Sequence, residues 1–478
     1  MKLVRLAEAV QMDAGEYGEQ QVTGFAIDHR KVAPGTIFGA FQGAAHNGED
    51  YIDAAIAAGA VAIVARGGLE IRGAAYLATD EPRAVFARLA AKFYAPFPDT
   101  VVAVTGTNGK TSTVEMTRQL WRMAGFHAAS IGTLGVTTAG DQATTGLTTP
   151  DVVTFLSNVA GLRREGVTHL AFEASSHGLS QYRTEGLPVQ AAAFTNLSRD
   201  HLDYHGDMAA YFTAKLRLFS EVVDGDGAVV VWMDDPESGR VIDLARERGL
   251  RLLGVGAHGE TLRLLSRSPT QLGQTLTIEA EGATHVVNLP LIGAYQAANA
   301  LVSAGLVLAT GAELKTVLGH LARLQPVRGR LERAAITRAG APVYVDYAHT
   351  PDAIEAAIQA LRPHAKGRLI VVIGAGGDRD TGKRPQMGAI AVAQADVVIV
   401  TDDNPRSEDP AAIRADVMAG APGAIEIAGR REAIAAAIEQ AGADDIVLIA
   451  GKGHEQGQIV GDRVLPFDDV TVARECAA

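Results

Sequence analysis

The chain has 478 residues, of which 47% are hydrophobic, a formal charge of −12 and a single cysteine, Cys476. This length is too great for one hydrophobic core and predicts three domains. The negative charge excludes a general nucleic-acid-binding surface, and the single cysteine excludes an internal disulfide and a cysteine metal cage, as is typical of a reducing cytoplasm.

Residues 1–98 combine short apolar runs with turn residues, which is typical of a small α/β domain. Glu8 interrupts the apolar stretch that a signal peptide would need, so we expect the protein to stay in the cytoplasm. A strand is predicted over 60–65. Segment 94–99 has two prolines and no apolar period, and is predicted to be the linker that ends this domain.

Residues 105–112 read Thr-Gly-Thr-Asn-Gly-Lys-Thr-Ser and follow the apolar run 101–104. A buried strand followed by a glycine turn, a lysine, a hydroxyl and a helical pattern is how proteins bind nucleotide phosphates. Glycines let backbone N–H groups approach the phosphates, Lys110 reaches the outer ones, and the Thr111 hydroxyl can ligate Mg²⁺. The general pattern has glycine where Val104 stands, so a strand-to-helix turn that merely carries a lysine is the alternative.

Two later strands of the central region end in polar clusters. A strand that ends at Phe172 is followed by Glu173, and the strand 191–194 is followed by His201 and His205. Ligands of open α/β sheets bind outside the carboxyl ends of the strands, so these side chains are candidates for a cation-phosphate site. The alternative is that the histidines are capping or core residues.

Residues 289–312 carry no charge and are long enough to cross a membrane. However, alanine and glycine supply much of this stretch, and Gln296 and Asn299 share one helix face. We therefore predict a buried helix with one polar edge and no membrane insertion.

Residues 331–478 contain four apolar runs, each followed by a polar loop. Such runs, separated by helical stretches, predict a parallel sheet buried on both faces, whose loops share one rim. The charged and polar residues of those loops include Arg379, Asp403, Asn404, Arg406 and Glu455. Mixed acidic and basic side chains suit a zwitterionic ligand, and a solvated salt-bridge network is the alternative.

The fold class predicted from these patterns is α/β with three domains. They are a small N-terminal α/β domain (1–98), a central P-loop domain with a parallel sheet (99–330) and a C-terminal Rossmann-like α/β domain (331–478).

Six motifs, in this order, resemble those of the Mur ligase family. They begin at Thr105, Glu173, Asn196, Asp346, Asp403 and Gly451, and read TGTNGKT, EASSHG, NLSRDHLDYHG, DYAHTPD, DNPR and GKGHE. The resemblance spans all three predicted domains. It implies an ATP-dependent carboxylate–amine ligase of peptidoglycan precursor synthesis, which acts on UDP-N-acetylmuramoyl-L-alanyl-D-glutamate through an acyl phosphate and forms ADP and phosphate.

The resemblance also implies roles for individual residues. ATP would contact Thr105, Gly106, Thr107, Asn108, Gly109, Lys110, Thr111, Ser112, Asn299 and Arg330. Mg²⁺ would be bound by Thr111, Glu173 and His201. The UDP-muramoyl dipeptide would contact Ile27, His29, Ala44, Ala45, His46, Thr148, Thr149, Ser175, Gln181 and Arg183. The incoming amino acid would contact Arg379, Asp403, Asn404, Pro405, Arg406, Gly451 and Glu455.

The catalytic residues implied are Lys110, Lys215 and His205. Lys215 matches a lysine that the family carries as a carbamate derived from CO₂, which would turn a cation into a carboxylate able to position Mg²⁺. His205 or a carboxylate of the site would deprotonate the incoming amine, and the sequence leaves that choice open. The implied partners are small-molecule substrates, and we expect a monomer.

Arg406 within Asp-Asn-Pro-Arg favours meso-2,6-diaminopimelate as the incoming amino acid, because a second carboxylate suits a forked guanidinium. L-Lysine and L-ornithine remain alternatives. A folylpolyglutamate-synthase-like ligase would share the phosphate loop but is not expected to carry that motif. A P-loop ATPase or nucleotide-binding module would share only the opening stretch.

Overall fold

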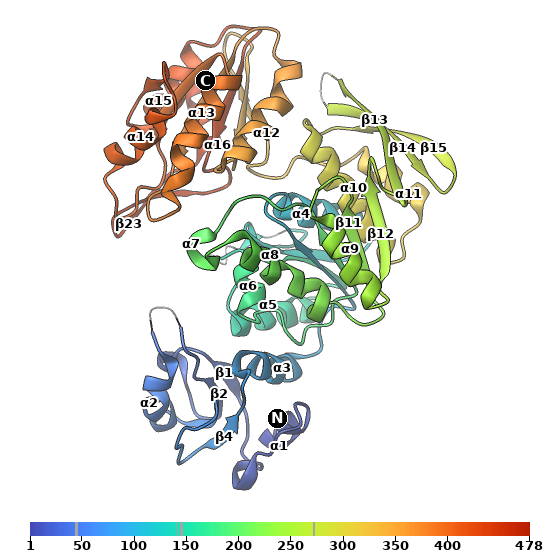
Figure 1. Cartoon of the computed structure of the whole chain (residues 1–478), viewed down its shortest axis with the longest axis vertical. Helices are drawn as coiled ribbons and strands as arrows, with labels where there is room; N and C mark the ends of the chain where they lie inside the picture. Colours follow the sequence, from blue (N-terminus) through green and yellow to red (C-terminus); the bar gives the residue numbers. More distant parts are fainter. Residues whose placement is uncertain (44–45, 141, 144–146, 271–272) are drawn as a thin grey trace.

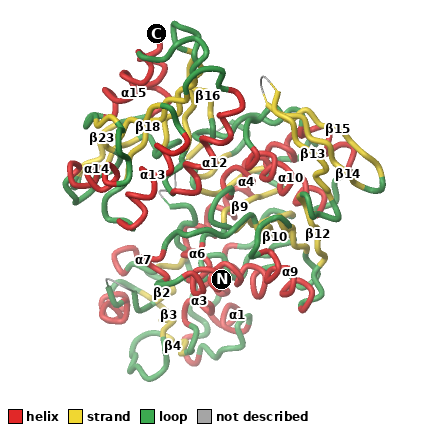
Figure 2. Tube along the Cα trace, turned by 45° about the horizontal axis from the view of Figure 1, so that its top comes forward, coloured by secondary structure: helices red, strands yellow, loops and turns green. Residues whose placement is uncertain are grey.

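The computed structural model describes residues 1–43, 46–140, 142–143, 147–270 and 273–478. Its three large sheets fall in three successive stretches of the chain. The stretch with the largest sheet lies between the other two in both views (Figures 1 and 2). The predicted mixed α/β fold with parallel sheets is confirmed.

The N-terminal sheet is parallel, with the order β1-β2-β3-β4. Its strands are β1 (Gly24–Ala26), β2 (Thr36–Gly39), β3 (Ala60–Ala65) and β4 (Ala75–Ala78), and its helices are α1 (Leu3–Glu8), α2 (Ile52–Ala57) and α3 (Pro82–Tyr94). The strand predicted over 60–65 is present. Phe86 of α3 meets Phe25 of β1 edge to face at 5.3 Å, so aromatic packing holds this helix on the sheet. Within the predicted linker 94–99, residues 95–99 contain neither helix nor strand, whereas Tyr94 is the last residue of α3.

The central sheet has the order β15-β14-β13-β12-β11-β10-β5-β9-β6-β7-β8. Its strands are β5 (Thr100–Thr105), β6 (Ala128–Gly132), β7 (Gly135–Thr137), β8 (Gln142–Ala143), β9 (His169–Glu173), β10 (Ala191–Phe194), β11 (Ala228–Trp232), β12 (Arg251–Gly256), β13 (Leu262–Thr270), β14 (Gly273–Ala280) and β15 (Ala283–Leu289). Its helices are α4 (Lys110–Met123), α5 (Val152–Arg164), α6 (Ser176–Ser180), α7 (Leu202–His205), α8 (Met208–Arg217), α9 (Ser238–Glu247), α10 (Ala294–Ala309) and α11 (Leu314–Leu321). The middle of the sheet is parallel, and β5 lies between β9 and β10, so their three carboxyl ends meet at one edge.

Two features of the central region were not predicted from the sequence. Strands β13, β14 and β15 form an antiparallel extension of the sheet, and residues 202–205 form the short helix α7. Helix α10 is the buried helix predicted within 289–312, and both Gln296 and Asn299 are buried on it. No helix of the described residues is long and apolar enough to span a membrane.

The C-terminal sheet has the order β16-β17-β21-β18-β19-β20. Its strands are β16 (Glu332–Ile336), β17 (Pro342–Asp346), β18 (Leu369–Ala375), β19 (Val397–Asp402), β20 (Ile425–Glu426) and β21 (Ile446–Ala450). A separate hairpin comprises β22 (Gly457–Val460) and β23 (Arg463–Pro466), and the helices are α12 (Pro351–Leu361), α13 (Arg384–Gln394), α14 (Pro410–Ala419), α15 (Arg430–Glu439) and α16 (Asp469–Ala477).

The four apolar runs of this region are β17, β18, β19 and β21, and they pair in parallel as predicted. The sheet is buried on both faces because helices cover each side, which explains why the runs show no polar alternation. Their carboxyl ends deliver the polar loops to the edge that faces the central region.

Candidate active site

The loop after β5 is shaped by two glycines with positive φ, Gly106 at 144° and Gly109 at 86°. A Cβ on Gly106 would lie 1.9 Å from Oγ1 of Thr195, and a Cβ on Gly109 would lie 2.3 Å from Oδ1 of Asn299. Only glycine fits either position. The loop therefore packs closely against β10 and α10 and exposes its backbone at the start of α4.

Lys110 is the first residue of α4, and its Nζ donates to the carbonyls of Gly106 at 3.0 Å and Thr107 at 2.8 Å. Burial lowers the pKa of Lys110, although the charges of Glu173 and Asp200 oppose that shift. An ammonium at a helix N-terminus, beside a glycine loop with exposed backbone, is an arrangement that can bind an anion.

Arg330 connects the C-terminal region to this loop. Its Nη2 donates to Oγ1 of Thr111 at 3.1 Å, and its guanidinium lies 4.6 Å from the centroid of the Tyr347 ring. His454 Nδ1 lies 3.5 Å from Nη1 of the same arginine. The structure thus places Arg330 beside Thr111 of the P-loop, although the two residues are 219 positions apart in the sequence.

Glu173 ends β9 beside the P-loop strand. Its two oxygens accept from the backbone N–H of Thr133 at 2.7 Å and from the Thr133 hydroxyl at 3.1 Å. Burial raises the pKa of the Glu173 carboxyl, although Lys110 and hydrogen bonds from Thr133 and Thr111 oppose that shift. A desolvated carboxylate next to a phosphate loop would gain from a bound cation.

His201 has a left-handed backbone, with φ of 54°, and its Nε2 lies 3.6 Å from a carboxylate oxygen of Asp200. Burial lowers the pKa of His201 to about 4, so its imidazole is neutral near pH 7 and can act as a metal ligand. Among the described residues, no group of three or more His, Cys, Asp or Glu side chains is arranged to hold a metal. The predicted set of Thr111, Glu173 and His201 supplies only one carboxylate.

Lys215 lies on α8 with 1% of its surface exposed, and its Nζ donates to the carbonyl of Gly106 at 2.7 Å. The ammonium also lies 4.3 Å from the centroid of the Tyr211 ring. Burial and the charge of Lys110 lower the pKa of Lys215 well below its usual range. Burial therefore favours the neutral amine of this lysine more than it would at an exposed position.

His205 lies with its Nε2 3.0 Å from Oγ of Ser176, and its ring contacts those of His177 and Tyr211. Burial and the charge of His177 lower the pKa of His205 to about 4, which makes it a weak base.

Helix α10 presents two buried polar atoms that have no hydrogen-bond partner within the described part of the chain. They are Oε1 of Gln296 and Nδ2 of Asn299. The two residues are three positions apart and share a helix face, and Asn299 packs on Gly109 of the phosphate loop. An unpaired buried polar group is costly, so Gln296 and Asn299 are candidates for contacts that the described residues do not supply.

A cavity of about 970 Å³ lies between the central and C-terminal regions. The central region contributes four residues predicted for the muramoyl dipeptide, Thr148, Thr149, Ser175 and Arg183, and also His201. The C-terminal region contributes Tyr347 and His349 from the loop after β17, and Gly374, Arg379, Asp403, Asn404, Arg406, Gly451 and Glu455 from the other three loops. The four polar loops therefore do share one rim, and they face the dipeptide residues across the cavity.

Hydrogen bonds connect the dipeptide residues to one another. Thr149 Oγ1 lies 2.9 Å from Oγ of Ser175, and Nη1 of Arg183 donates to the carbonyl of Thr149 at 2.5 Å. Nη2 of Arg183 donates to Oε1 of Gln181 at 2.9 Å, and Thr148 Oγ1 lies 3.1 Å from Oγ1 of Thr133. These side chains form one polar wall that ends at Glu173.

The loop after β19 is held in a strained form. Arg406 has a φ of 53°, and its Nη1 donates to the carbonyl of Gly377 at 2.8 Å. A Cβ on Gly451, at φ 118°, would lie 2.6 Å from Oδ2 of Asp403, so glycine is needed there. Pro405 lies buried between Asn404 and Arg406.

The predicted uridine diphosphate contacts lie elsewhere. Ile27, His29 and His46 do not line the 970 Å³ cavity, and the His29 ring stacks on Tyr51 with 4.2 Å between centroids. Ala44 and Ala45 lie outside the described residues.

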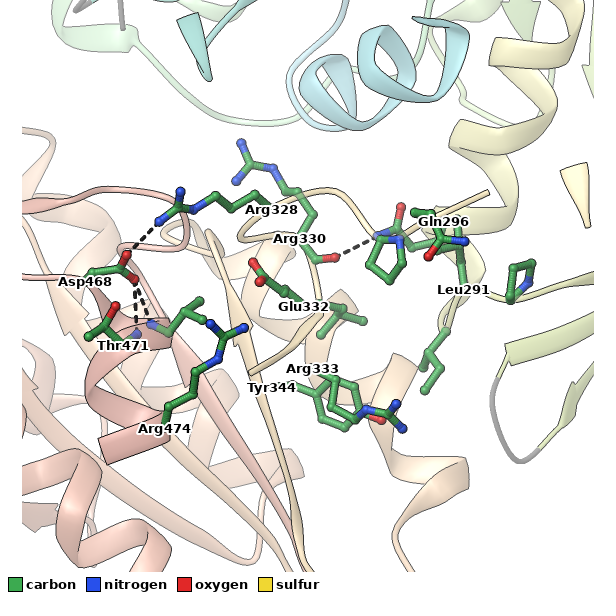
Figure 3. Close-up of a pocket in the computed structure, with 16 residues that line it drawn as sticks. Leu291, Gln296, Arg328, Arg330, Glu332, Arg333, Tyr344, Asp468, Thr471 and Arg474 are labelled. Atoms are coloured by element: carbon green, nitrogen blue, oxygen red, sulfur yellow. Dashed lines mark hydrogen bonds and ion pairs between the residues drawn. The ribbon is translucent and has the colours of Figure 1, made fainter. Parts of the chain in front are cut away.

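A second cavity, of about 590 Å³, lies beside the linker that enters β16 (Figure 3). Arg333 and Arg474 lie on one side of this linker, whereas Arg328 and Arg330 extend from its other side (Figure 3). Arg328 donates to a carboxylate oxygen of Asp468 at 2.6 Å.

Sequence reasoning missed several residues of this site. Lys452 and His454 belong to the motif in which Gly451 and Glu455 were assigned, and Asp200 belongs to the motif that contains His201 and His205. Tyr347 lies in a motif of which no member was assigned, and Lys383 lines the cavity without any signal in the sequence. Lys452 and His454 could have been found, because they flank Gly451 and Glu455 in one motif.

Comparisons with known proteins find similarity over nearly the whole chain. The family described as Mur ligase middle domain matches residues 104–307, and the one described as Mur ligase, glutamate ligase domain matches 329–453. The chain is 60% identical over 458 residues to the UDP-N-acetylmuramoyl-L-alanyl-D-glutamate–2,6-diaminopimelate ligase of Zymomonas mobilis, covering 95% of this chain and 94% of that one. It is 52% identical over 453 residues to the ligase of the same name from Bradyrhizobium diazoefficiens, covering 94% and 93%. A solved structure of a ligase of that name superposes with a TM-score of 0.73 at 32% identity, covering 100% of this chain and 98% of the other.

Proposed function

The chain belongs to the Mur ligase family, and from that premise we propose that it joins meso-2,6-diaminopimelate to UDP-N-acetylmuramoyl-L-alanyl-D-glutamate with cleavage of ATP to ADP and phosphate. The observation that carries the proposal is the 970 Å³ cavity. One of its walls offers Thr149, Ser175 and Arg183, and the other offers acids and arginines from the C-terminal loops. A dipeptide carboxylate and an amino acid would meet there, beside the phosphate loop.

The two unpaired atoms on α10 support ATP as the nucleotide. The exposed edge of adenine carries an amino donor at N6 and an acceptor at N7, and Asn or Gln side chains can pair with both. Gln296 Oε1 would accept from N6, and Asn299 Nδ2 would donate to N7. Guanine would instead place a carbonyl against Gln296.

Mg²⁺ would be held by Thr111 and Glu173, with His201 as a further ligand. The raised pKa of the buried Glu173 carboxyl supports this, because a cation would relieve its desolvation. When bound, the ion supplies charge neutralisation at the phosphates.

The first step is phosphoryl transfer. A carboxylate oxygen of the glutamyl residue attacks the γ-phosphorus in line, the bond from that phosphorus to the bridging oxygen breaks, and ADP leaves an acyl phosphate behind. Lys110, held at the start of α4, stabilises the negative charge of the transferring group. Arg330 reaches the same loop from the C-terminal side.

The second step is attack by the amino acid. The neutral amine bonds to the acyl carbon, phosphate leaves with the electrons of the carbon–oxygen bond, and the amine proton passes to a base. His205, with its pKa lowered to about 4, is a weak candidate, and a carboxylate of the site is the alternative.

We assign Lys215 as a carbamate. Its lowered pKa and burial support this, because only a neutral amine can attack the carbon of CO₂, forming an N–C bond and releasing a proton. Density for a bare amine in the active enzyme, together with activity that ignores bicarbonate, would contradict this assignment.

The remaining assignments follow the three stretches of the chain. Residues 1–98 would bind the uridine diphosphate through Ile27, His29 and His46, and the His29–Tyr51 ring stack supports an aromatic surface there. Residues 99–330 would bind ATP and residues 331–478 the amino acid. We propose a cytoplasmic monomer, which light scattering on a sizing column tests.

The choice of amino acid rests on Arg406 and Arg379, which would pair with the second carboxylate of diaminopimelate. L-Lysine and L-ornithine lack a second carboxylate, so they would leave Arg406 and Arg379 without this partner. Phosphate release from ATP, measured with the UDP-muramoyl dipeptide and each amino acid in turn, tests the proposal. Release with lysine alone would overturn the specificity, and release with none would overturn the function.

A further inference from the structure

Lys452 is a fully buried cation beneath the amino-acid side of the cavity. It follows β21 by two residues, and 0% of it is exposed. Its Nζ donates to three oxygens, namely Oδ1 of Asn404 at 3.0 Å, Oε2 of Glu455 at 3.1 Å and the carbonyl of Gly457 at 2.6 Å. An ammonium has three N–H donors, so every donor of Lys452 is used.

This arrangement excludes direct contact with a substrate. Lys452 is buried, has no donor to spare and does not line the 970 Å³ cavity, whereas Asn404 and Glu455 both line it. Any influence of Lys452 on a ligand must therefore pass through its three hydrogen-bond partners, Asn404, Glu455 and Gly457, all of which line the cavity.

Lys452 fixes the direction of the Asn404 amide. Oδ1 of Asn404 accepts from Lys452 and, at 2.9 Å, from the backbone N–H of Ile459. Nδ2 must then point the other way, and it donates to Oε2 of Glu455 at 2.7 Å. A reversed amide would face two donors with its own NH₂, so one orientation is set.

The same network leaves one oxygen of Glu455 for a ligand. Oε2 accepts from both Lys452 and Asn404, and no protein donor within the described residues reaches Oε1. The Glu455 carboxylate and the buried Lys452 ammonium form an ion pair at 3.1 Å. Glu455 is thus an oriented acceptor on a cavity wall that also carries Arg379 and Arg406.

We propose that Lys452 is a positioning residue that orients Glu455 to accept the distal ammonium group of a diamino dicarboxylic acid. This inference rests on the proposed function and deepens it, because it names the group that recognises the second amine. The arginines on the same wall would bind the distal carboxylate. The protein would therefore recognise the distal end of the ligand by both its ammonium and its carboxylate.

A purely structural role is the competing explanation, since Lys452 also joins the loop after β19 to the loop after β21. A structural role would weaken binding of every amino acid alike. A positioning role would weaken only ligands that carry the distal amine, so a ligand that lacks this amine distinguishes the two.

The experiment combines a variant with a substrate analogue in the full-length enzyme. KM is measured for diaminopimelate and for L-2-aminopimelate, which keeps both carboxylates and one amine, in wild type and in Lys452→Met. In wild type, loss of the distal amine should raise KM about 10- to 100-fold. In Lys452→Met, KM for diaminopimelate should rise by a similar factor, and the two ligands should then differ by less than about threefold.

Arg368→Met is the matched control, because it removes a cation that pairs with Asp445 at 2.8 Å at the opposite edge of the same sheet. It should lower Tm but keep the wild-type ratio of the two KM values. If Lys452→Met does not fold, Lys452→Arg carries the same measurement, since a planar fork cannot reproduce the three bonds of an ammonium.

An unchanged ratio in a folded Lys452 variant would overturn the inference while leaving the proposed function intact. Absence of diaminopimelate-dependent phosphate release in wild type would instead reject the proposed function itself. The KM for ATP, which should stay within about twofold, reports whether the phosphate loop has been disturbed.

Discussion

Replacing Asn299 by leucine should change ATP affinity and stability in opposite directions. Asn299 is 4% exposed, and its Nδ2 is buried without a partner among the described residues. A buried unpaired donor costs about 1–3 kcal/mol, and leucine of similar volume removes that cost. Asn299→Leu should therefore leave the ligand-free protein as stable as wild type or more so.

The same substitution should weaken nucleotide binding. Loss of one hydrogen bond to the base, about 1–1.5 kcal/mol, corresponds to roughly a tenfold rise in Kd. At an ADP concentration of about 1,000 times the wild-type Kd, stabilisation by the ligand should fall from about 4.1 to about 2.7 kcal/mol.

Thermal unfolding with and without ADP and Mg²⁺, together with calorimetric titration, measures both effects. Ser303→Ala is the control, because Ser303 lies one turn further along α10 and donates to the carbonyl of Thr113 at 2.9 Å. It should lower Tm without changing Kd. A less stable ligand-free Asn299→Leu protein with an unchanged response to ADP would refute the adenine assignment.

Three further predictions concern other parts of the site. Arg406→Lys should raise KM for diaminopimelate about 10- to 100-fold in steady-state assays, because the point charge of an ammonium replaces the forked guanidinium. An equal effect on the slow turnover of L-lysine would contradict the role of Arg406 in binding the second carboxylate. Lys215→Met should lower kcat at least about 100-fold at every bicarbonate concentration while the circular dichroism spectrum stays native, and retained activity would contradict the carbamate. Burial lowers the pKa of His454 to about 3, below that of an unfolded histidine at about 6.5, so the unfolded chain binds the extra proton between these values. The free energy of unfolding should therefore fall on acidification from pH 7 to 5, by up to about 2 kcal/mol for His454. Urea titrations of His454→Asn should show a smaller fall than those of wild type. An equal fall would contradict the lowered pKa of His454.

The sequence predicted those features that depend on local pattern. The phosphate loop was recognisable from glycine, lysine and hydroxyl spacing after an apolar run, and the C-terminal sheet from four runs without polar alternation. Parallel strands place their loops at one edge, so the clustering of Arg406 and Glu455 also followed.

What the sequence could not predict depends on contacts between distant segments. The hydrogen bond from Arg330 to Thr111 requires the packing of two separate sheets. The three hydrogen bonds of Lys452 require that the loops after β19 and β21 approach each other closely. The unpaired atom of Gln296 becomes visible only once the helix is buried. The antiparallel strands β13 to β15 depend on pairing rather than on any motif.

The most direct test of the central claim is phosphate release from ATP by the purified protein with UDP-N-acetylmuramoyl-L-alanyl-D-glutamate. The amino acids supplied in parallel are diaminopimelate, L-lysine, L-ornithine and L-glutamate. The account predicts rapid release with diaminopimelate and little with the other three. Equal release with all four, or release with none, would contradict it.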